Sequence, residues 1–383
     1  MGQDIVFFLV VAVALAFDFT NGFHDTANSM ATTIATGALK PKQAVTVAAI
    51  LNFVGAFLSL TVVATIAKGI VDAGAVTPEI IFAGLAGAIA WNLATWWFGI
   101  PSSSSHALIG GVVGATIVAV GTNAVMFDGI ASKVLIPAVI APILAGLVAL
   151  LATVIVYRII RGLEVNRAER GFRWAQVASS STVALAHGTN DAQKTMGIIV
   201  LAMISTGRLP DSGFDVPTWV IVSCATAIAL GTWTGGWRII KTLGNDVTEV
   251  RAPQGFSSES VAATVILASS HFGYPLSTTQ VVSGAVTGSG VARPGNSVDW
   301  RVIGRIVVGW LLTLPAAAIA GGLANATVEL FGTDQPEVGA LIVASVGAVG
   351  CFLLWRANQR SKVDPDSVVE FAPEPADAAK AIA

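Results

Sequence analysis

Long apolar runs, separated by short polar segments, make up most of the chain. We expect a helix in each run, because a helix needs about 20 apolar residues to cross a bilayer and most of the runs are that long. They cover residues 5–35, 43–67, 80–98, 104–126, 134–157, 174–206, 217–237, 258–292, 303–328 and 338–355. The pattern predicts an all-α polytopic membrane protein.

The composition agrees with a membrane environment. Of the 383 residues, 54% are hydrophobic and only 11% are charged, whereas a soluble domain has about 25% charged residues. The two cysteines, Cys224 and Cys351, lie inside apolar runs without paired spacing, so we expect neither a disulfide framework nor a thiolate metal site. We expect no cofactor, no resident metal ion and no nucleic acid partner.

Basic residues are distributed unevenly between alternate loops. Most Lys and Arg residues, from Lys40 to Lys362, fall in one set of loops. The other set holds only Lys68, Lys133 and Arg208. The positive-inside rule places the first set and the C-terminus in the cytoplasm, and the N-terminus outside the plasma (inner) membrane. This topology requires 80–126 and 257–292 each to enter and leave the membrane on the same side, as re-entrant hairpins.

Two polar motifs occur twice along the chain, in the same order. Residues 21–28, Asn-Gly-Phe-His-Asp-Thr-Ala-Asn, resemble residues 187–194, His-Gly-Thr-Asn-Asp-Ala-Gln-Lys. Residues 99–106 resemble 273–280, since both have Gly, then Pro, then a run of hydroxyl side chains. An odd number of crossings separates the first copies from the second. The second copies therefore have opposite polarity, which predicts the inverted repeat common among transporters.

This repeat divides the chain into five parts. We expect a first transmembrane repeat (1–157), a basic cytoplasmic linker (158–173), a second, inverted repeat (174–337), an additional C-terminal helix (338–357) and a disordered tail (358–383). The tail is acidic and rich in Ala, so it buries too little apolar area to offset the entropy of ordering.

Asp25 and Asp191 lie within apolar segments, where a carboxylate costs about 2.5–3.5 kcal/mol. Gly22 and Gly188 beside them are expected to break their helices and to free backbone carbonyls. The resulting oxygen-rich set suits Na⁺ or a titrating carboxylate and comprises Asp25, Asn28, Asn190, Asp191 and Gln193. The alternative is that each acid only pairs with a neighbour, His24 or Lys194, and fixes packing.

Two further observations stay open at this point. Asp18 either shares the site or satisfies helix termini. The four histidines, His24, His106, His187 and His271, all adjoin the motifs. They form either a proton relay, since imidazole titrates near neutral pH, or a set of neutral hydrogen-bonding groups in the core.

The second motif pair places Pro101 and Pro275 before hydroxyl residues that open Gly-rich apolar helices. Such a helix start within the membrane directs free amides and the positive end of the helix dipole at the site, which favours an anion. The hydroxyl groups that would add donors for a tetrahedral oxyanion belong to Ser103, Ser104, Ser105, Ser277, Thr278 and Thr279. The alternative is ordinary N-capping, or packing between helices.

At these motifs the chain resembles the inorganic phosphate transporter (PiT) family, in its bacterial low-affinity phosphate permease type. The family signature, Gly-Ala-Asn-Asp-Val-Ala-Asn, is similar to residues 22–28 and 188–194. The resemblance implies two inverted repeats with re-entrant hairpins and no enzymatic activity. It also implies phosphate held by the hairpin hydroxyls and a coupling cation held by the signature acids and amides, with transport by alternating access.

One departure from the signature affects the coupling ion. Lys194 stands where the signature ends in Asn, and an ammonium group cannot ligate a cation. We therefore expect symport of phosphate with H⁺ in preference to Na⁺, with Lys194, His24 and His187 as charge partners. A divalent-metal phosphate complex is an alternative substrate.

Other functions fit parts of the pattern. A sulfate permease of the same fold would use the same oxyanion site. An intramembrane aspartyl protease would use the two acids, but the second acid lacks a Gly-x-Gly-Asp motif and the hydroxyl hairpins would have no role. A channel would differ by its higher conductance. A homodimer in the lipid bilayer stays open as the assembly.

Overall fold

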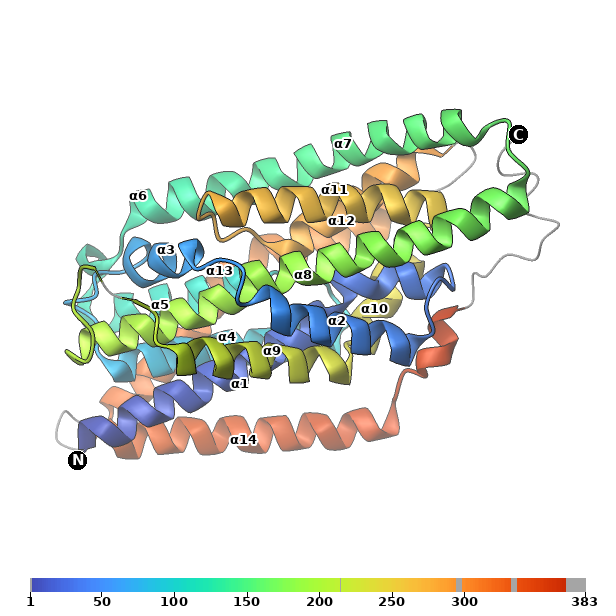
Figure 1. Cartoon of the computed structure of the whole chain (residues 1–383). Coiled ribbons are helices and arrows are strands. Elements are labelled where there is room, and N and C mark those ends of the chain that lie inside the picture. Colours follow the sequence, from blue (N-terminus) through green and yellow to red (C-terminus); the bar gives the residue numbers. More distant parts are fainter. Residues whose placement is uncertain (1, 214, 294–297, 332–335, 370–383) are drawn as a thin grey trace.

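The computed structural model describes residues 2–213, 215–293, 298–331 and 336–369. These residues form helices joined by short segments (Figure 1), with one isolated β-bridge between Val71 and Val125. The predicted all-α fold is confirmed.

The first half contains α1 (Gly2–Ala35), α2 (Pro41–Gly55), α3 (Thr61–Gly69), α4 (Pro78–Trp97), α5 (Ser104–Val120), η1 (Thr122–Ala124), α6 (Phe127–Ile130), η2 (Ala131–Leu135) and α7 (Ile136–Ile160). The second half contains α8 (Val165–Ser205), α9 (Thr218–Thr234), α10 (Trp237–Lys241), η3 (Thr242–Asp246), α11 (Ala252–His271), α12 (Thr278–Ala292) and α13 (Trp300–Glu329). The chain continues through α14 (Pro336–Arg360) and η4 (Pro365–Val369).

Five helical segments of the described chain are long and apolar enough to cross a membrane. They are α1, α4, α6 to α7, α13 and α14, and the bent pair of α9 with α10 and η3 makes a sixth. The chain is therefore a multi-pass membrane protein.

The order of elements repeats from one half to the next. Each half has a long helix with the signature, a pair of shorter helices, a hairpin and a second long helix. In Figure 1, α1 runs away from the end that carries the N-terminus, whereas α8 runs back toward it. These directions support the inverted relation predicted from the sequence.

The helices of the two halves are interlocked through glycine contacts. A Cβ atom on Gly110 or Gly114 of α5 would lie 2.4 Å from Leu314 O and 1.9 Å from Ala318 O of α13. The same arrangement occurs on α12, where a Cβ atom on Gly284 or Gly288 would lie 2.3 Å from Pro142 O and 1.9 Å from Gly146 O of α7. Small residues let helix backbones approach closely in a membrane. The hairpin helix of each half therefore packs on the last helix of the other half.

The prediction that Gly22 and Gly188 break their helices is wrong. Both α1 and α8 run through the signature without interruption. A Cβ atom on Gly22 would lie 2.3 Å from Ile228 O of α9, and one on Gly188 would lie 2.2 Å from Asn52 O of α2. These glycines allow close helix contacts, so the carbonyls expected to be free stay in the helical hydrogen bonds.

Breaks do occur, but in the short helices that follow. The apolar run 43–67 divides into α2 and α3. In the second half, α9 meets α10 and η3 at a bend of 62°. Gly235 lies at this bend with φ +71°, a conformation that is strained for other residues.

Each predicted hairpin is present as two helices joined by a short turn. Gly99 and Gly273 begin the turns with φ +64° and +73°. The turns end in serine N-caps, since Ser103 accepts a hydrogen bond from His106 N and Ser277 accepts one from Gln280 N. The caps are buried, so α5 and α12 begin inside the protein.

The boundary segments differ from the expected loops. Only residues 161–164 of the basic segment 158–173 separate α7 from α8. The predicted disorder of 358–383 is wrong for its first part, because η4 packs there and Asn245 Nδ2 donates to Val368 O at 3.2 Å. Residues 370–383 lie outside the described residues.

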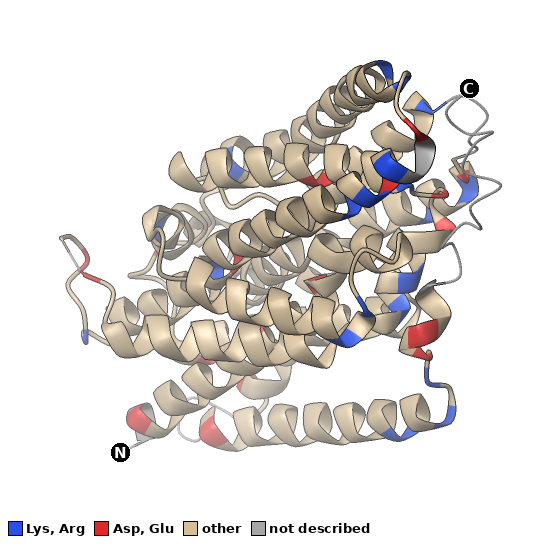
Figure 2. Cartoon of the chain, turned by 45° about the vertical axis from the view of Figure 1, so that its right-hand side comes forward, with Lys and Arg blue, Asp and Glu red and all other residues tan. Residues whose placement is uncertain are grey.

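Most Lys and Arg residues gather at the end of the helices opposite the N-terminus (Figure 2).

Candidate functional site

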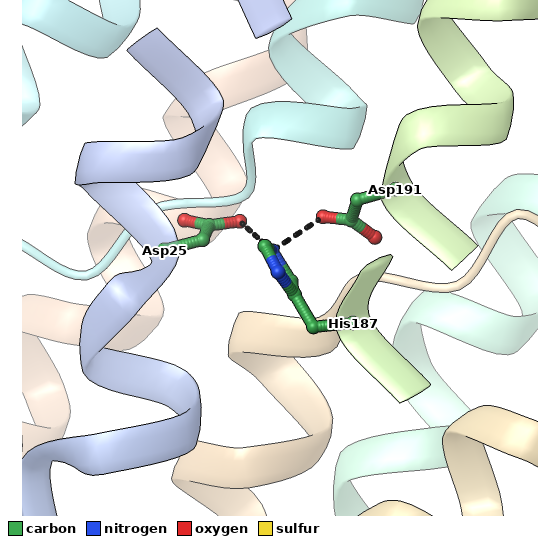
Figure 3. A group of neighbouring side chains, drawn as sticks. All are labelled: Asp25, His187 and Asp191. Carbon is green, nitrogen blue, oxygen red and sulfur yellow. Dashed lines mark ion pairs between the residues drawn. The ribbon is translucent and has the colours of Figure 1, made fainter. Parts of the chain in front are cut away.

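The two signature acids meet in the centre of the protein, on either side of one imidazole (Figure 3). His187 Nε2 lies 3.2 Å from Asp191 Oδ2 and 4.0 Å from Asp25 Oδ2. All three side chains are buried, and their ligand atoms lie within 4.8 Å of one another. The structure thus brings Asp25 and Asp191 together as the sequence predicted, at a spacing that one cation could bridge.

Each acid receives a hydrogen bond from the first residue of a hairpin helix. Ser104 Oγ donates to Asp25 Oδ2 at 2.7 Å and contacts Asn21 Oδ1 at 2.9 Å. Thr278 Oγ1 donates to Asp191 Oδ2 at 3.3 Å. The N-termini of α5 and α12 therefore point at the acids of their own halves.

A second set of hydrogen bonds crosses between the halves. Asn28 Nδ2 of α1 donates to Thr278 Oγ1 at 3.2 Å and to Thr279 Oγ1 at 3.0 Å. At the corresponding position of α8, Lys194 Nζ donates to Ser105 Oγ at 2.6 Å. The last signature residue of each half thus holds the hairpin of the other half.

Lys194 is the departure from the signature that brings a positive charge into the site, and its ammonium group has three oxygen partners. Lys194 Nζ lies 2.6 Å from Asp191 Oδ1, 2.6 Å from Ser105 Oγ and 2.7 Å from Leu276 O. The side chain is only 1% exposed. A carboxylate, a hydroxyl and a main-chain carbonyl are hard oxygen donors of the kind that alkali and alkaline-earth cations use. The ammonium group therefore occupies a position suited to a cation.

Hydrogen bonds to the two imidazoles restrict where their protons lie. His24 Nδ1 lies 2.7 Å from Asp25 Oδ1, and its Nε2 lies 3.0 Å from Thr95 Oγ1. His187 Nδ1 lies 3.1 Å from Asn52 Oδ1, an acceptor. His187 Nδ1 must then carry a hydrogen, and a second proton on Nε2 would make the ring a cation facing both carboxylates.

Two amide oxygens in the site have no donor. Asn28 Oδ1 and Asn190 Oδ1 are buried and accept no hydrogen bond from the described residues. The amide group of Asn190 is fixed because its Nδ2 donates to Ser270 Oγ at 2.8 Å. Both oxygens are available to a cation or a protonated substrate.

Some predicted residues lie outside this cluster. Gln193 Oε1 accepts from Val62 N at 2.8 Å at the start of α3, and its Nε2 donates to Thr189 O. Ser103 and Ser277 cap their helices, as described above. His271 is exposed at the end of α11, whereas His106 is buried in α5.

Sequence reasoning missed several polar residues of the core. Asn21, Asn52 and Thr95 each bond a site residue. Asn21 belongs to the first motif but was not chosen as a site residue, whereas Asn52 and Thr95 were marked only by their positions in apolar runs. Glu259 is a buried carboxylate on α11 that accepts four hydrogen bonds. Its donors are Thr32, Thr33, Gln176 and Ser179.

The sequence matches the phosphate transporter family over residues 21–166 and 160–321, which together cover most of the chain. The chain belongs to this family. The resemblance found in the motifs is confirmed. The protease alternative is excluded, because the relatives described below are named as transporters and not as enzymes.

Members of the phosphate transporter family resemble the chain over nearly its full length. A probable low-affinity inorganic phosphate transporter of Mycobacterium bovis is 55% identical over 96% of this chain and 87% of the relative. Proteins of the same name from Rhizobium meliloti and Bacillus subtilis are 46% and 43% identical, each over 84% of this chain and 96% of the relative. A solved structure described as the sodium-dependent phosphate transporter has a TM-score of 0.76 at 26% identity, covering 85% of this chain and 99% of its own.

Proposed function

We propose that this member of the phosphate transporter family takes up inorganic phosphate together with protons, by alternating access. The names of its relatives support phosphate as the substrate. The position of Lys194 supports protons over Na⁺, and the coupling ion depends on that single observation.

The site supports binding of phosphate between the two hairpins. The free amides at the starts of α5 and α12 and the hydroxyls of Ser104, Ser105, Thr278 and Thr279 are donors for phosphate oxygens. In this conformation those hydroxyls bond to Asp25, Asp191, Asn28 and Lys194. Phosphate therefore has to displace these internal bonds, and the hairpins have to move apart to admit it.

The charges of the site require a coupling cation. Asp25 and Asp191 bring two negative charges and Lys194 brings one positive charge, so phosphate would enter a site that is already negative. Burying uncompensated charge in a membrane is costly. Protons on the imidazoles or carboxylates would neutralise the excess, and His187 lies between both acids.

The ammonium group of Lys194 argues against Na⁺ as that cation. It already contacts three oxygens at distances of 2.6–2.7 Å, and a sodium ion would have to replace it there. The related solved structure is described as sodium-dependent. Its sequence is only 26% identical to this chain, so its coupling ion does not carry over directly.

Alternating access fits a closed site at the junction of two interlocked halves. All residues of the cluster are buried, so this conformation opens to neither side. The basic end of the bundle would face the cytoplasm under the positive-inside rule, with the N-terminus outside. The homodimer stays a prediction.

Uptake by proteoliposomes with separate Na⁺ and pH gradients tests the proposal. We expect phosphate accumulation when the outside is acidic, and no stimulation by an inward Na⁺ gradient at equal pH. Accumulation driven by Na⁺ alone would contradict proton coupling. Excess sulfate that blocks phosphate uptake would favour the sulfate permease. Loss of uptake when a chelator removes divalent cations would indicate a metal phosphate as the substrate.

A further inference from the structure

Asp18 is a buried acid outside the cluster described above. Its side chain is 0% exposed, and neither carboxyl oxygen accepts a hydrogen bond from any residue that the structure describes. It lies in the middle of α1, so it caps no helix end. Of the two roles left open by the sequence, satisfying helix termini is excluded.

Two polar side chains of neighbouring helices lie near Asp18. The hydroxyl of Thr195 on α8 lies beside the carboxyl without forming a hydrogen bond of good geometry. The thiol of Cys224 on α9 is close enough for the charge of Asp18 to act on it, and it is 0% exposed. Neighbouring positions such as Phe17 belong to an apolar core. A sodium ion needs several oxygen ligands, whereas a proton needs only the carboxyl itself.

The charged groups near Asp18 belong to the transport site. Asp18 precedes Asp25 by seven residues, about two helical turns, so both lie on one face of α1. From α8, the charges of Asp191 and Lys194 act on its carboxyl. The only ionisable residue of α4 is Glu79, in its first turn.

We infer that Asp18 is a proton-binding site of the transport cycle, and that it is neutral in the closed conformation seen here. An ionised carboxylate without donors is unstable in an apolar interior, because nothing replaces its hydration. The inference extends the proposed proton coupling to a residue outside the phosphate site. The proton comes from external water and later leaves to cytoplasmic water, while Asp18 alternates between the acid and the carboxylate.

Lys194 links the state of Asp18 to the transport site. It is the cation that acts on Asp18, and it is also the partner of Asp191. Loss of the Asp18 proton would draw the ammonium group away from Asp191 and Ser105, which loosens the contact between α8 and the first hairpin. Proton occupancy and closure of the site then favour the same state, as coupling requires.

Infrared difference spectroscopy tests the protonation without any transport. The wild-type spectrum minus that of Asp18→Asn, both phosphate-free at neutral pH, should contain the carbonyl-stretch band of a neutral carboxyl. The neighbouring variant Cys224→Ala is the control. It keeps Asp18, so its own spectrum should still contain this band. Absence of the band from the wild-type minus Asp18→Asn spectrum would overturn the inference.

Uptake and exchange by Asp18→Asn test its role in coupling. Asn resembles the protonated acid in shape and cannot lose a proton. Acid-driven accumulation should fall at least about tenfold, whereas exchange of internal for external phosphate should stay within about twofold of wild type. Equal acid-driven accumulation by the variant and the wild type would refute the role of Asp18, while the proposed proton coupling of the transporter would still stand. If the wild type follows Na⁺ instead of pH, the proposed proton coupling is wrong as well.

Discussion

Lys194 and Asn28 occupy corresponding positions of the two signatures, and the difference between them decides the chemistry of the site. Each donates a hydrogen bond to the hairpin of the other half. Only Asn28 keeps a free oxygen, and only Lys194 brings a charge. Under the proposed proton coupling, Lys194 would replace both an oxygen ligand and the ion that this ligand would hold.

We expect Lys194→Asn to create a sodium-binding site. The amide restores the residue that the family signature has here, and removal of the ammonium group leaves Asp191, Ser105 and Leu276 O around a space for a cation. The unfolding temperature of the variant should rise with NaCl, because a ligand stabilises the state that it binds. KCl at equal ionic strength is the control. Equal unfolding temperatures in NaCl and KCl would show that Lys194 does not stand in for sodium.

We expect Asp25→Asn and Asp191→Asn both to insert normally and to lose transport. A loss of at least about 100-fold corresponds to about 2.7 kcal/mol of binding or coupling energy. Asp191→Asn should also unfold more easily, because an unpaired buried Lys194 costs about 3–5 kcal/mol. Asp25→Asn leaves that ion pair intact. Phosphate uptake and thermal unfolding of both variants measure these effects, and wild-type uptake by either would remove its acid from the mechanism.

Helix contacts explain where sequence reasoning succeeded and where it did not. The apolar runs, the hairpins and the meeting of Asp25 with Asp191 were predictable, because each follows from local pattern or from the repeat. Ser103 and Ser277 were expected to bind phosphate, but they cap their helices, which was the alternative. The continuity of α1 and α8 was not, because a glycine looks the same whether it breaks a helix or lets another helix approach. The partner of Gln193 was also hidden, since Val62 is distant in sequence.

We expect Gly22→Ala to destabilise the contact between α1 and α9. The added Cβ atom would lie 2.3 Å from Ile228 O, so the helices must separate, which costs about 1–3 kcal/mol. Gly347→Ala on α14 is the matched control, because a Cβ atom there meets nothing within 4 Å. Thermal unfolding of the two variants should differ accordingly. If the Gly22→Ala protein unfolds at the same temperature as the wild type, the close contact between α1 and α9 does not contribute to stability.

The two halves of the molecule hold each other together, because the hairpin helix of each half packs on the last helix of the other half. They do not form two separate cores. The contacts of α5 with α13 and of α12 with α7 are equivalent, and the site lies where the exchanged hairpins meet. Neither hairpin is complete within its own half.

We expect the two halves to be inactive alone and active together. Residues 161–164 between α7 and α8 are the natural place to divide the chain. Fragments 1–162 and 163–383, expressed together, should restore phosphate uptake, whereas each fragment alone should be degraded. Uptake by either fragment alone would contradict the interlocked arrangement.

The same exchange has a consequence for biosynthesis. While the ribosome is still translating the second half, α5 has no α13 to cover its glycine face, and the polar start of this helix stays without its partners from α8. The newly inserted first half is then an obvious target for membrane chaperones and quality-control proteases. A chain terminated after α7 would on this view be cleared from the membrane instead of persisting as half a transporter.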